Sequence, residues 1–278
     1  MSADKDFRIN VFKKAALCRH FENEVFKKVE EKIIQFPVYL SAGQEYIPAT
    51  ISELCGDIKP LIFGQHRGHS TYLSFGGKIE ELIDELLGRK TGCAYGMGGS
   101  ASIHSKEINM YGHDGMMGSQ VPIAVGACYS TKLPTIAIMG DASAEEDYVL
   151  GALGWASTKN LPILFIVEDN NLSILTEKHV RRSWNIHEVS NSFGVESYNI
   201  TDNPFELYKY KDKLFKKPML LNINTHRLYW HSGAGIDNED EFDRYKTEMG
   251  LLGLQAENID KMMEKKVKEA WQKQLEKQ

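Results

Sequence analysis

The chain has 278 residues, of which 42% are hydrophobic and 26% charged, as is typical of a soluble globular protein with a sizeable core. Its net charge of −5 indicates no basic surface for nucleic acid, and no apolar run is long enough to span a membrane. The four cysteines show neither close pairing nor zinc spacing, and the amino-terminal residues lack the basic and apolar regions of a signal peptide. We therefore expect a cytoplasmic protein with reduced thiols.

The first part of the chain predicts mainly helices. A stripe of apolar residues at helical spacing predicts a long helix from about residue 7 to residue 35. A second helix opens at Gly43-Gln44-Glu45 and runs to Leu54, and residues 61–63 are a short strand candidate. Residues 78–87 are amphipathic with helical spacing, and the following glycine suits the end of that helix.

The second part alternates between helices and strands. Residues 91–118, rich in Gly, Ser and Met, form a loop that is unusually long for a compact domain, and such loops are usually functional or disordered. A helix is expected after Val121-Pro122, and a charged helix over 256–278 ends the chain. Three apolar runs, each just after a proline, read as buried strands at 135–139, 163–167 and 219–223. This alternation predicts a parallel sheet in a single domain, residues 1–278.

Polar residues follow two of these strands directly. Asp141 stands after the first strand and Asn170 after the second, with one helix-length stretch between them. In a parallel sheet both turns emerge at the carboxyl end, where ligands usually bind. A carboxylate and an amide oxygen together suit Mg²⁺, which completes its shell with water and substrate phosphates. The alternative is that both are ordinary turn residues after strands.

The segment Gly140-Asp141-Ala142-Ser143, followed one β-α-β unit later by Asn170, resembles the thiamine-diphosphate motif. The resemblance implies that Asp141 and Asn170 bind Mg²⁺ through their side chains, and that Leu172 binds it through its backbone carbonyl. It also implies that backbone N–H groups of Ala142 and Ser143 face the diphosphate, since helix starts favour anions.

Further segments extend this resemblance over most of the chain. Residues 86–93, 98–100 and 118–122 are similar in order and spacing to the alpha subunit of the first component of 2-oxoacid dehydrogenases, the pyruvate, branched-chain and acetoin group. The resemblance implies a doubly wound, mostly parallel α/β sheet flanked by helices. It also implies a separate beta subunit that supplies the second half of each active site in an α₂β₂ assembly.

Two segments resemble the parts of this family that hold the cofactor. Gln65-His66-Arg67-Gly68-His69 resembles the element that grips the diphosphate, with Arg67 as the phosphate ligand, His66 in place of the usual tyrosine, and His69 as a catalytic candidate. Gly115 and Met117 match the loop whose backbone cradles the aminopyrimidine. Without the resemblance, a surface arginine beside solvated histidines and a flexible Gly/Met loop would be the simpler interpretations.

A third segment, residues 227–232, resembles the active-site loop of the family. Arg227 is its basic residue and a further cofactor ligand, and His231 occupies the position of a catalytic histidine that also contacts the cofactor. A histidine suits proton transfer or carboxylate binding near neutral pH. The alternative for His231 is a loop histidine without a role. Ser232 falls where some family members are phosphorylated, but this sequence alone does not support regulation.

The sequence departs from the family pattern in several places. Ala142 replaces a glycine, which would weaken binding if the backbone there were left-handed and would cost little otherwise. Tyr39 stands where the dehydrogenases carry an active-site histidine. The set of proton-transferring residues of the dehydrogenases therefore cannot be assigned directly to this chain. His104, His113 and Asp114 are either substrate contacts or parts of a polar loop.

Three functions follow from these observations. The first is a thiamine-diphosphate- and Mg²⁺-dependent subunit that decarboxylates a 2-oxoacid and passes the acyl group to a lipoyl domain or another oxidant. The second, which Tyr39 and the altered loop near His113 favour, is a two-subunit transketolase-like or carboligating enzyme acting on a sugar or a 2-oxoacid. The third is a non-catalytic scaffold. Because the family's beta subunit supplies the glutamate that protonates the pyrimidine, we expect the chain to be inactive alone.

Overall fold

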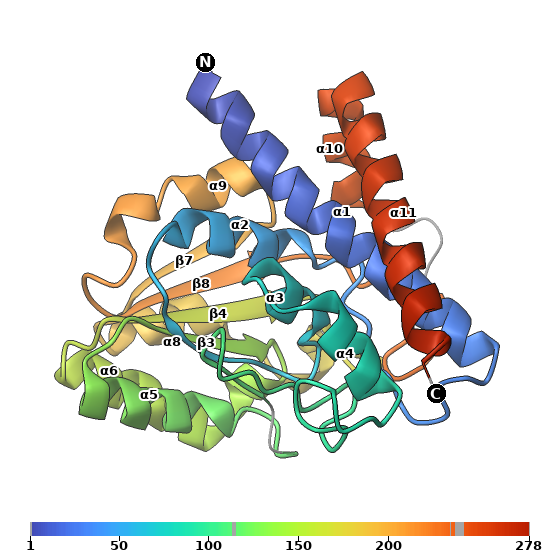
Figure 1. Cartoon of the computed structure of the whole chain (residues 1–278). Coiled ribbons are helices and arrows are strands. Elements are labelled where there is room, and N and C mark those ends of the chain that lie inside the picture. Colours follow the sequence, from blue (N-terminus) through green and yellow to red (C-terminus); the bar gives the residue numbers. More distant parts are fainter. Residues whose placement is uncertain (1, 113–114, 234, 237–241, 278) are drawn as a thin grey trace.

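One six-stranded parallel sheet forms the centre of the computed structural model, which describes residues 2–112, 115–233, 235–236 and 242–277 (Figure 1). The strand order is β2-β1-β3-β4-β8-β7. The strands, in that order, are β2 (Met110–Tyr111), β1 (Leu61–Phe63), β3 (Thr135–Gly140), β4 (Ile163–Asp169), β8 (Met219–Asn224) and β7 (Glu196–Thr201). The four strands predicted from the sequence are confirmed, and so is the parallel sheet.

Alternate side chains of the central strands enter two separate cores. Ile136 and Ile138 of β3 belong to one cluster, whereas Ala137 and Met139 belong to the other. Helices cover both faces, so β3 and β4 are buried along almost their whole length. This explains why they read as continuous apolar runs in the sequence.

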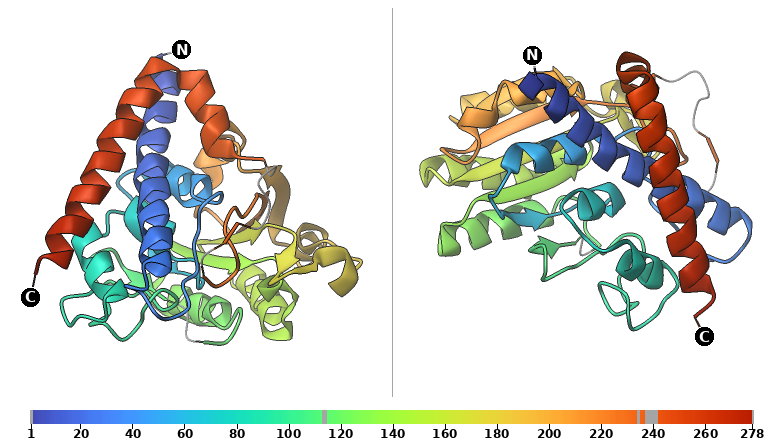
Figure 2. Two further views of the ribbon diagram at one scale, coloured as in Figure 1. Left: turned by 90° about the vertical axis from the view of Figure 1, so that its right-hand side faces the viewer. Right: turned by 45° about the horizontal axis from the view of Figure 1, so that its top comes forward.

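The helices divide between these two faces (Figure 1). One face is covered by α5 (Gln120–Thr131), α6 (Asp147–Thr158) and α8 (Ile186–Ser192), whose residues belong to the second core. The other is covered by α1 (Ser2–Glu30), α2 (Tyr46–Cys55), α3 (His69–Ser74), α4 (Ile79–Leu86), α9 (Pro204–Tyr208), α10 (Arg244–Leu252) and α11 (Leu254–Leu275). Helix α11 packs along α1, with the Phe21 and Trp271 rings 6.1 Å apart (Figure 2).

Several elements differ from the prediction. Helix α1 ends at Glu30 rather than near residue 35, because the chain turns at Lys32, where φ is +58°. The charged carboxyl-terminal helix is preceded by α10, from which Gly253 separates it. Strands β2 and β7 were not predicted, because both lie at the edges of the sheet and carry polar or exposed residues. No described helix combines the length and apolarity needed to cross a bilayer.

The long Gly-rich loop after α4 is organised by one buried carboxylate. Glu85, which has no exposed surface, accepts hydrogen bonds from the backbone N–H groups of Ala94, Gly96, Gly98 and Gly99 at 2.7–3.0 Å. A carboxylate that accepts several backbone N–H groups replaces the hydrogen bonds that water would otherwise supply. The first part of the loop is therefore built around α4.

The sheet changes direction between β1 and β3. The chain passes from β1 to β2 at one edge, and from β3 to β4 on the opposite side. In open α/β sheets such a switch point leaves a crevice at the carboxyl ends of the strands, where ligands bind. The residues after β1, β3 and β4 are therefore the first place to look for a site.

Candidate active site

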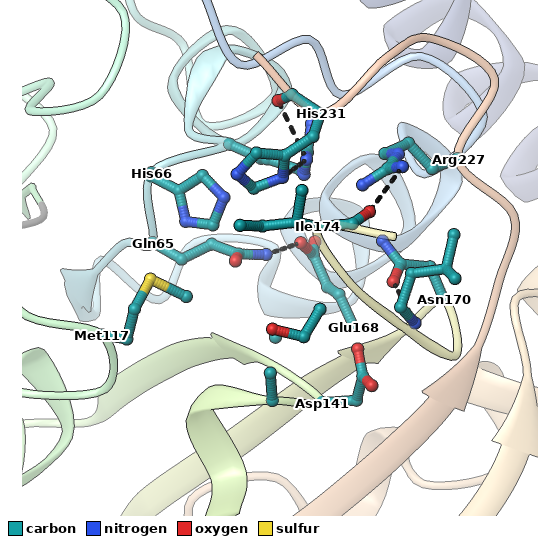
Figure 3. A pocket seen from close by; sticks show the side chains of 14 residues that line it. Gln65, His66, Met117, Asp141, Glu168, Asn170, Ile174, Arg227 and His231 are labelled. Carbon is teal, nitrogen blue, oxygen red and sulfur yellow. Dashed lines mark hydrogen bonds between the residues drawn. The ribbon is translucent and has the colours of Figure 1, made fainter. Parts of the chain in front are cut away.

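A cavity of about 180 Å³ lies at this switch point (Figure 3). It is bounded by residues at or soon after the carboxyl ends of four neighbouring strands, β1, β3, β4 and β8, and by Met117 of the long Gly-rich loop. The residues that line it are Gln65, His66, Arg67, Met117, Gly140, Asp141, Ala142, Glu168, Asn170, Leu172, Ser173, Ile174, Arg227 and His231. Nine of the predicted site residues, Leu172 among them, therefore line one cavity.

Asp141 follows β3 and is almost completely buried. The guanidinium of Arg181 donates a hydrogen bond to its Oδ2, and Arg182 Nη1 donates one of 2.9 Å to its backbone carbonyl. Burial, and next the negative charge of Asp169, raise the pKa of the Asp141 carboxyl to about 6, although Arg181 opposes this rise. A cation at this carboxylate therefore compensates its burial.

Asn170 and Leu172 follow β4 on the same side of the cavity. The side-chain amide of Asn170 donates to Gln44 Oε1 at 3.1 Å, and its Oδ1 accepts from the backbone N–H of Leu172 at 3.1 Å. Between them Asn171 adopts a left-handed φ of +65°, which turns the chain sharply. Asp141, Asn170 and Leu172, the predicted metal ligands, all line the same cavity.

The backbone after Asp141 accommodates a side chain without strain. Ala142 lines the cavity with φ −70° and ψ −40°, in the right-handed helical region, so its methyl group carries no conformational cost. Ser143, which is buried, opens the short 3₁₀ helix η1 (Ser143–Glu145). The replacement of the family's glycine is therefore conformationally neutral here.

Arg67 and His231 are joined across the cavity. Arg67 Nη2 donates to His231 Nδ1 at 2.8 Å and to the His231 carbonyl at 3.1 Å, while its Nη1 donates to the Leu40 carbonyl at 2.9 Å. An arginine has no acceptor, so Nδ1 of His231 must be the acceptor. The ring is consequently neutral, with its proton on Nε2.

Two further rings, Tyr39 and His66, lie beside the His231 ring. The His66 ring lies 5.7 Å from the His231 ring, and the Tyr39 ring lies 4.9 Å from His66 and 5.6 Å from His231, measured between centroids. We call Tyr39, His66 and His231 the three-ring cluster. Tyr39, which departs from the family pattern, is thus in contact with two predicted site residues.

Of the remaining predicted cofactor residues, some line the cavity and others do not. Arg227, which is buried, lines it and donates to the Ile174 carbonyl at 3.0 Å. Met117 also lines it, and its backbone carbonyl accepts a hydrogen bond from the hydroxyl of Tyr148. Gly115 is two residues before Met117, with φ +108°, but is not part of the lining. Two possible substrate contacts, His113 and Asp114, lie outside the described residues.

His69 is the predicted catalytic residue that does not line the cavity. Its ring is fully buried, with Nδ1 3.0 Å from Glu22 Oε2 and Nε2 2.9 Å from the Ser100 hydroxyl. These contacts connect α1, α3 and the Gly-rich loop. The structure therefore brings His231, but not His69, into the cavity lining.

Glu168 lines the cavity, although no role was predicted for it. It is the Cα partner of Gly140 in the sheet and accepts hydrogen bonds from the side chains of Gln65 and Gln44. Burial raises the pKa of its carboxyl to about 7, against the hydrogen bond from Gln65 and the charge of Arg67. Its place at the end of β4, directly before Asp169 and Asn170, was the signal that could have identified it.

The oxygen atoms at the strand ends suit a cation that is also bound by oxygens of a ligand. Among the described residues, no group of three or more His, Cys, Asp or Glu side chains is placed to hold a metal ion. Asp141 instead offers one carboxylate beside the neutral oxygens of Asn170 and Leu172. Such a set suits Mg²⁺ that completes its octahedral shell with phosphate oxygens and water.

Comparisons with known proteins identify the family of the chain. The family model described as "Dehydrogenase E1 component" matches residues 13–278. The pyruvate dehydrogenase E1 component subunit alpha-1, mitochondrial, of Arabidopsis thaliana is 27% identical over 261 residues, covering 90% of this chain and 65% of that protein. The corresponding alpha subunit of Rickettsia prowazekii (strain Madrid E) is 27% identical over 274 residues, covering 92% of this chain and 83% of that protein.

Solved structures support the same fold. The transketolase of Campylobacter jejuni has a TM-score of 0.61 at 16% identity, covering 95% of this chain and 48% of that one. The transketolase of Leishmania mexicana has a TM-score of 0.59 at 14% identity. The chain spans about 65% of the length of the Arabidopsis relative. Because the family model covers nearly the whole chain, the protein belongs to the dehydrogenase E1 component family, as its motifs predicted.

Proposed function

We propose that this chain is the alpha subunit of a thiamine-diphosphate- and Mg²⁺-dependent enzyme that decarboxylates a 2-oxoacid together with a separate beta subunit. One observation carries the proposal: Asp141, Asn170, Arg67, Arg227 and His231 line a single cavity at the switch point of the sheet. Family membership implies the cofactor, and the relatives are named as pyruvate dehydrogenase subunits.

The residues present fit the two groups that the proposal requires. A guanidinium already compensates the charge of Asp141, so a cation is accommodated at this buried carboxylate. Asp141, Asn170 and the Leu172 carbonyl would hold Mg²⁺. Arg67 and Arg227, two cations in the lining, would bind the diphosphate oxygens.

The reaction divides between the cofactor and the protein. When bound, thiamine diphosphate supplies a nucleophilic carbon and an electron sink for C–C cleavage next to a carbonyl. His231, whose proton lies on Nε2, can donate a hydrogen bond to a substrate carboxylate or to a developing oxygen anion. Glu168, buried beside Gln65, can hold a proton within the cavity near neutral pH.

The size of the cavity supports a partner subunit. Pockets that enclose a whole drug-sized ligand measure about 300–1,000 Å³, whereas this one measures about 180 Å³. It suits the diphosphate end of the cofactor, and the remainder would lie against another protein surface. We therefore propose a beta subunit in an α₂β₂ assembly, with a lipoyl domain as the acyl acceptor.

A second candidate, a two-subunit transketolase-like or carboligating enzyme, is favoured by Tyr39. This residue replaces the dehydrogenase histidine and packs against both histidines of the three-ring cluster. A different group beside the reacting centre suits a different substrate or acceptor. Under this alternative a ketose or a 2-oxoacid donates the fragment, and the carbonyl group of an aldose or of a second 2-oxoacid, rather than a lipoyl domain, receives it.

The proposal is tested with the chain and its co-purified partner. Calorimetric titration with thiamine diphosphate should give Mg²⁺-dependent binding to the complex, and turnover should follow with a panel of 2-oxoacids. Turnover with ketoses instead would favour the second candidate. Absence of binding heat in the complex would contradict both and favour a scaffold without catalytic activity.

A further inference from the structure

Three cations from one short segment cover the acidic strand ends. Residues 174–182, which we call the clamp segment, contain part of the hairpin of β5 (Leu172–Ser173) and β6 (Thr176–Glu177), and the short helix α7 (Lys178–Arg181). Lys178 pairs with Asp169 at 2.5 Å, and Arg181 pairs with Asp141.

Arg181 bridges two carboxylates rather than one. Its Nη2 donates to Asp141 Oδ2 and its Nη1 donates to Glu145 Oε1. The adjacent Arg182 lies 3.3 Å from the same Glu145 oxygen and donates to the Asp141 carbonyl. The Arg181 side chain is 12% exposed, so its guanidinium lies mostly out of water. Since arginine keeps its charge at any accessible pH, Arg181 acts as a fixed positive charge on Asp141.

This contact involves the residue that the proposed function assigns to the metal. Arg181 pairs with Oδ2 of Asp141, and a divalent cation on either oxygen of this carboxylate would lie close to the guanidinium in a mostly buried site, where the two positive charges repel each other strongly. We propose, on the basis of the proposed function, that Arg181 is a built-in counter-cation of Asp141 and that Mg²⁺ binds by displacing it. Arg181 then retains Glu145 as its partner.

The clamp segment is built so that this exchange costs little. Helix α7 contributes no buried residue to either core, and Val180 is 67% exposed. Segments with few buried apolar contacts open at low free energy. Glu145, the second partner of Arg181, has a side chain that is 23% exposed. Arg181 can therefore leave Asp141 while it remains tied to the protein.

The displacement of Arg181 by the metal predicts how tightly the metal binds. A ligand that must displace an internal competitor binds more weakly by the free energy of that competition. Removal of the Arg181 charge should therefore lower the Mn²⁺ concentration needed for half-saturation by roughly tenfold. At saturating Mn²⁺ the competition is already complete, so affinity for thiamine diphosphate should stay within about threefold of the wild type.

The experiment uses Mn²⁺ as a paramagnetic probe. Free and bound Mn²⁺ are measured by electron paramagnetic resonance in the full chain with its partner, with thiamine diphosphate present. Arg181→Gln is compared with Lys178→Gln, which removes the same charge from the same helix but from Asp169. A general change in local potential would shift both variants equally, whereas displacement predicts a clearly larger shift for Arg181→Gln.

A second reading uses the wild-type protein. The Arg182 guanidinium lies 4.6 Å from the centre of the Trp184 ring, next to the clamp segment. Displacement of Arg181 should change Trp184 fluorescence when Mg²⁺ and thiamine diphosphate bind, and Trp184→Phe should remove that change. If Arg181→Gln fails to fold, this change in Trp184 fluorescence is the measurement that tests the displacement of Arg181.

The outcomes separate the two proposals. If the wild type binds Mn²⁺ in an Asp141-dependent way but Arg181→Gln shifts no more than Lys178→Gln, displacement is overturned and the proposed function stands. If Arg181→Gln instead weakens thiamine diphosphate binding at saturating Mn²⁺ by more than threefold, Arg181 is an anion ligand, which also overturns displacement. If the wild type binds no Mn²⁺ through Asp141, both proposals fail.

Discussion

Arg67 Nη2 donates to His231 Nδ1 at 2.8 Å, and this bond ties the loop after β1 to the loop after β8. The same guanidinium holds the carbonyls of His231 and Leu40. Arg67 therefore fixes the position and the tautomer of the histidine while it presents positive charge to the cavity. A lysine has one compact ammonium group and cannot reach these partners in the same planar arrangement.

Arg67→Lys should weaken thiamine diphosphate binding to the complex by about ten- to a hundredfold, because charge-assisted hydrogen bonds contribute about 1.5–3 kcal/mol each. Calorimetric titration at saturating Mg²⁺ measures this loss. Arg89→Lys is the matched control, since Arg89 also holds several partners, Asp84 and the Gln274 carbonyl, but lies outside the cavity lining. Equal affinities in the two variants would remove Arg67 from the cofactor site.

His231→Ala should leave cofactor binding near normal but slow turnover by about 10²–10⁴-fold, since it removes a proton donor. His231→Asn separates two roles of the ring, because an asparagine oxygen can replace Nδ1 as the acceptor for Arg67 without replacing the Nε2 proton. We expect the Asn variant to be as slow as the Ala variant in single-turnover assays. Recovery of turnover in the Asn variant would mean that His231 only positions Arg67.

Asp141→Ala should weaken Mg²⁺-dependent binding of thiamine diphosphate by at least about a hundredfold, because the remaining oxygens of the site are neutral. The fold should persist, as judged by far-ultraviolet circular dichroism. Asp169→Asn is the control, since it removes a neighbouring charge paired with Lys178 but lies outside the cavity lining. Unchanged affinity in Asp141→Ala would refute the metal assignment.

The core of the site was predictable because it depends on sheet geometry alone. Asp141 and Asn170 each follow a buried run, and neighbouring parallel strands bring such residues to one edge. The conformation of Ala142 was not predictable, because φ at a turn depends on how the following helix packs. A left-handed backbone at Ala142 would have weakened binding, whereas any other conformation would cost little. The observed φ of −70° is not left-handed, so the alanine costs little.

Other parts of the site depend on long-range folding that no local pattern encodes. The contact between Arg181 and Asp141 requires the chain after β4 to fold back over the strand ends, and no periodic pattern marks that return. His69 shares its sequence segment with Arg67, yet α3 directs it toward Glu22 in the core. Two residues of one short motif therefore have different roles: Arg67 lines the cavity, whereas His69 belongs to a buried hydrogen-bond network.

A buried cluster between α1 and the starts of α2 and α10 makes the stability of the fold depend on pH. Arg19 lies between Glu45 and Asp243, so one cation serves two carboxylates. Burial opposes ionisation of both, but the hydrogen bonds from Arg19 lower the pKa of Asp243, whereas burial raises the pKa of Glu45 to about 7. Glu45 is thus the carboxyl that holds a proton in the folded protein.

The sign of the effect follows from this shift. The pKa of Glu45 is raised from 4.5 in the folded state, so its contribution to stability is fully present below about pH 4.5 and is lost as pH rises toward 7. We expect a loss of about 3 kcal/mol from the free energy of unfolding over that range. Glu45→Gln, neutral at every pH, should flatten this slope in urea unfolding, whereas Glu53→Gln on the same helix should not. A slope in Glu45→Gln as steep as in the wild type would assign the pH dependence to other groups.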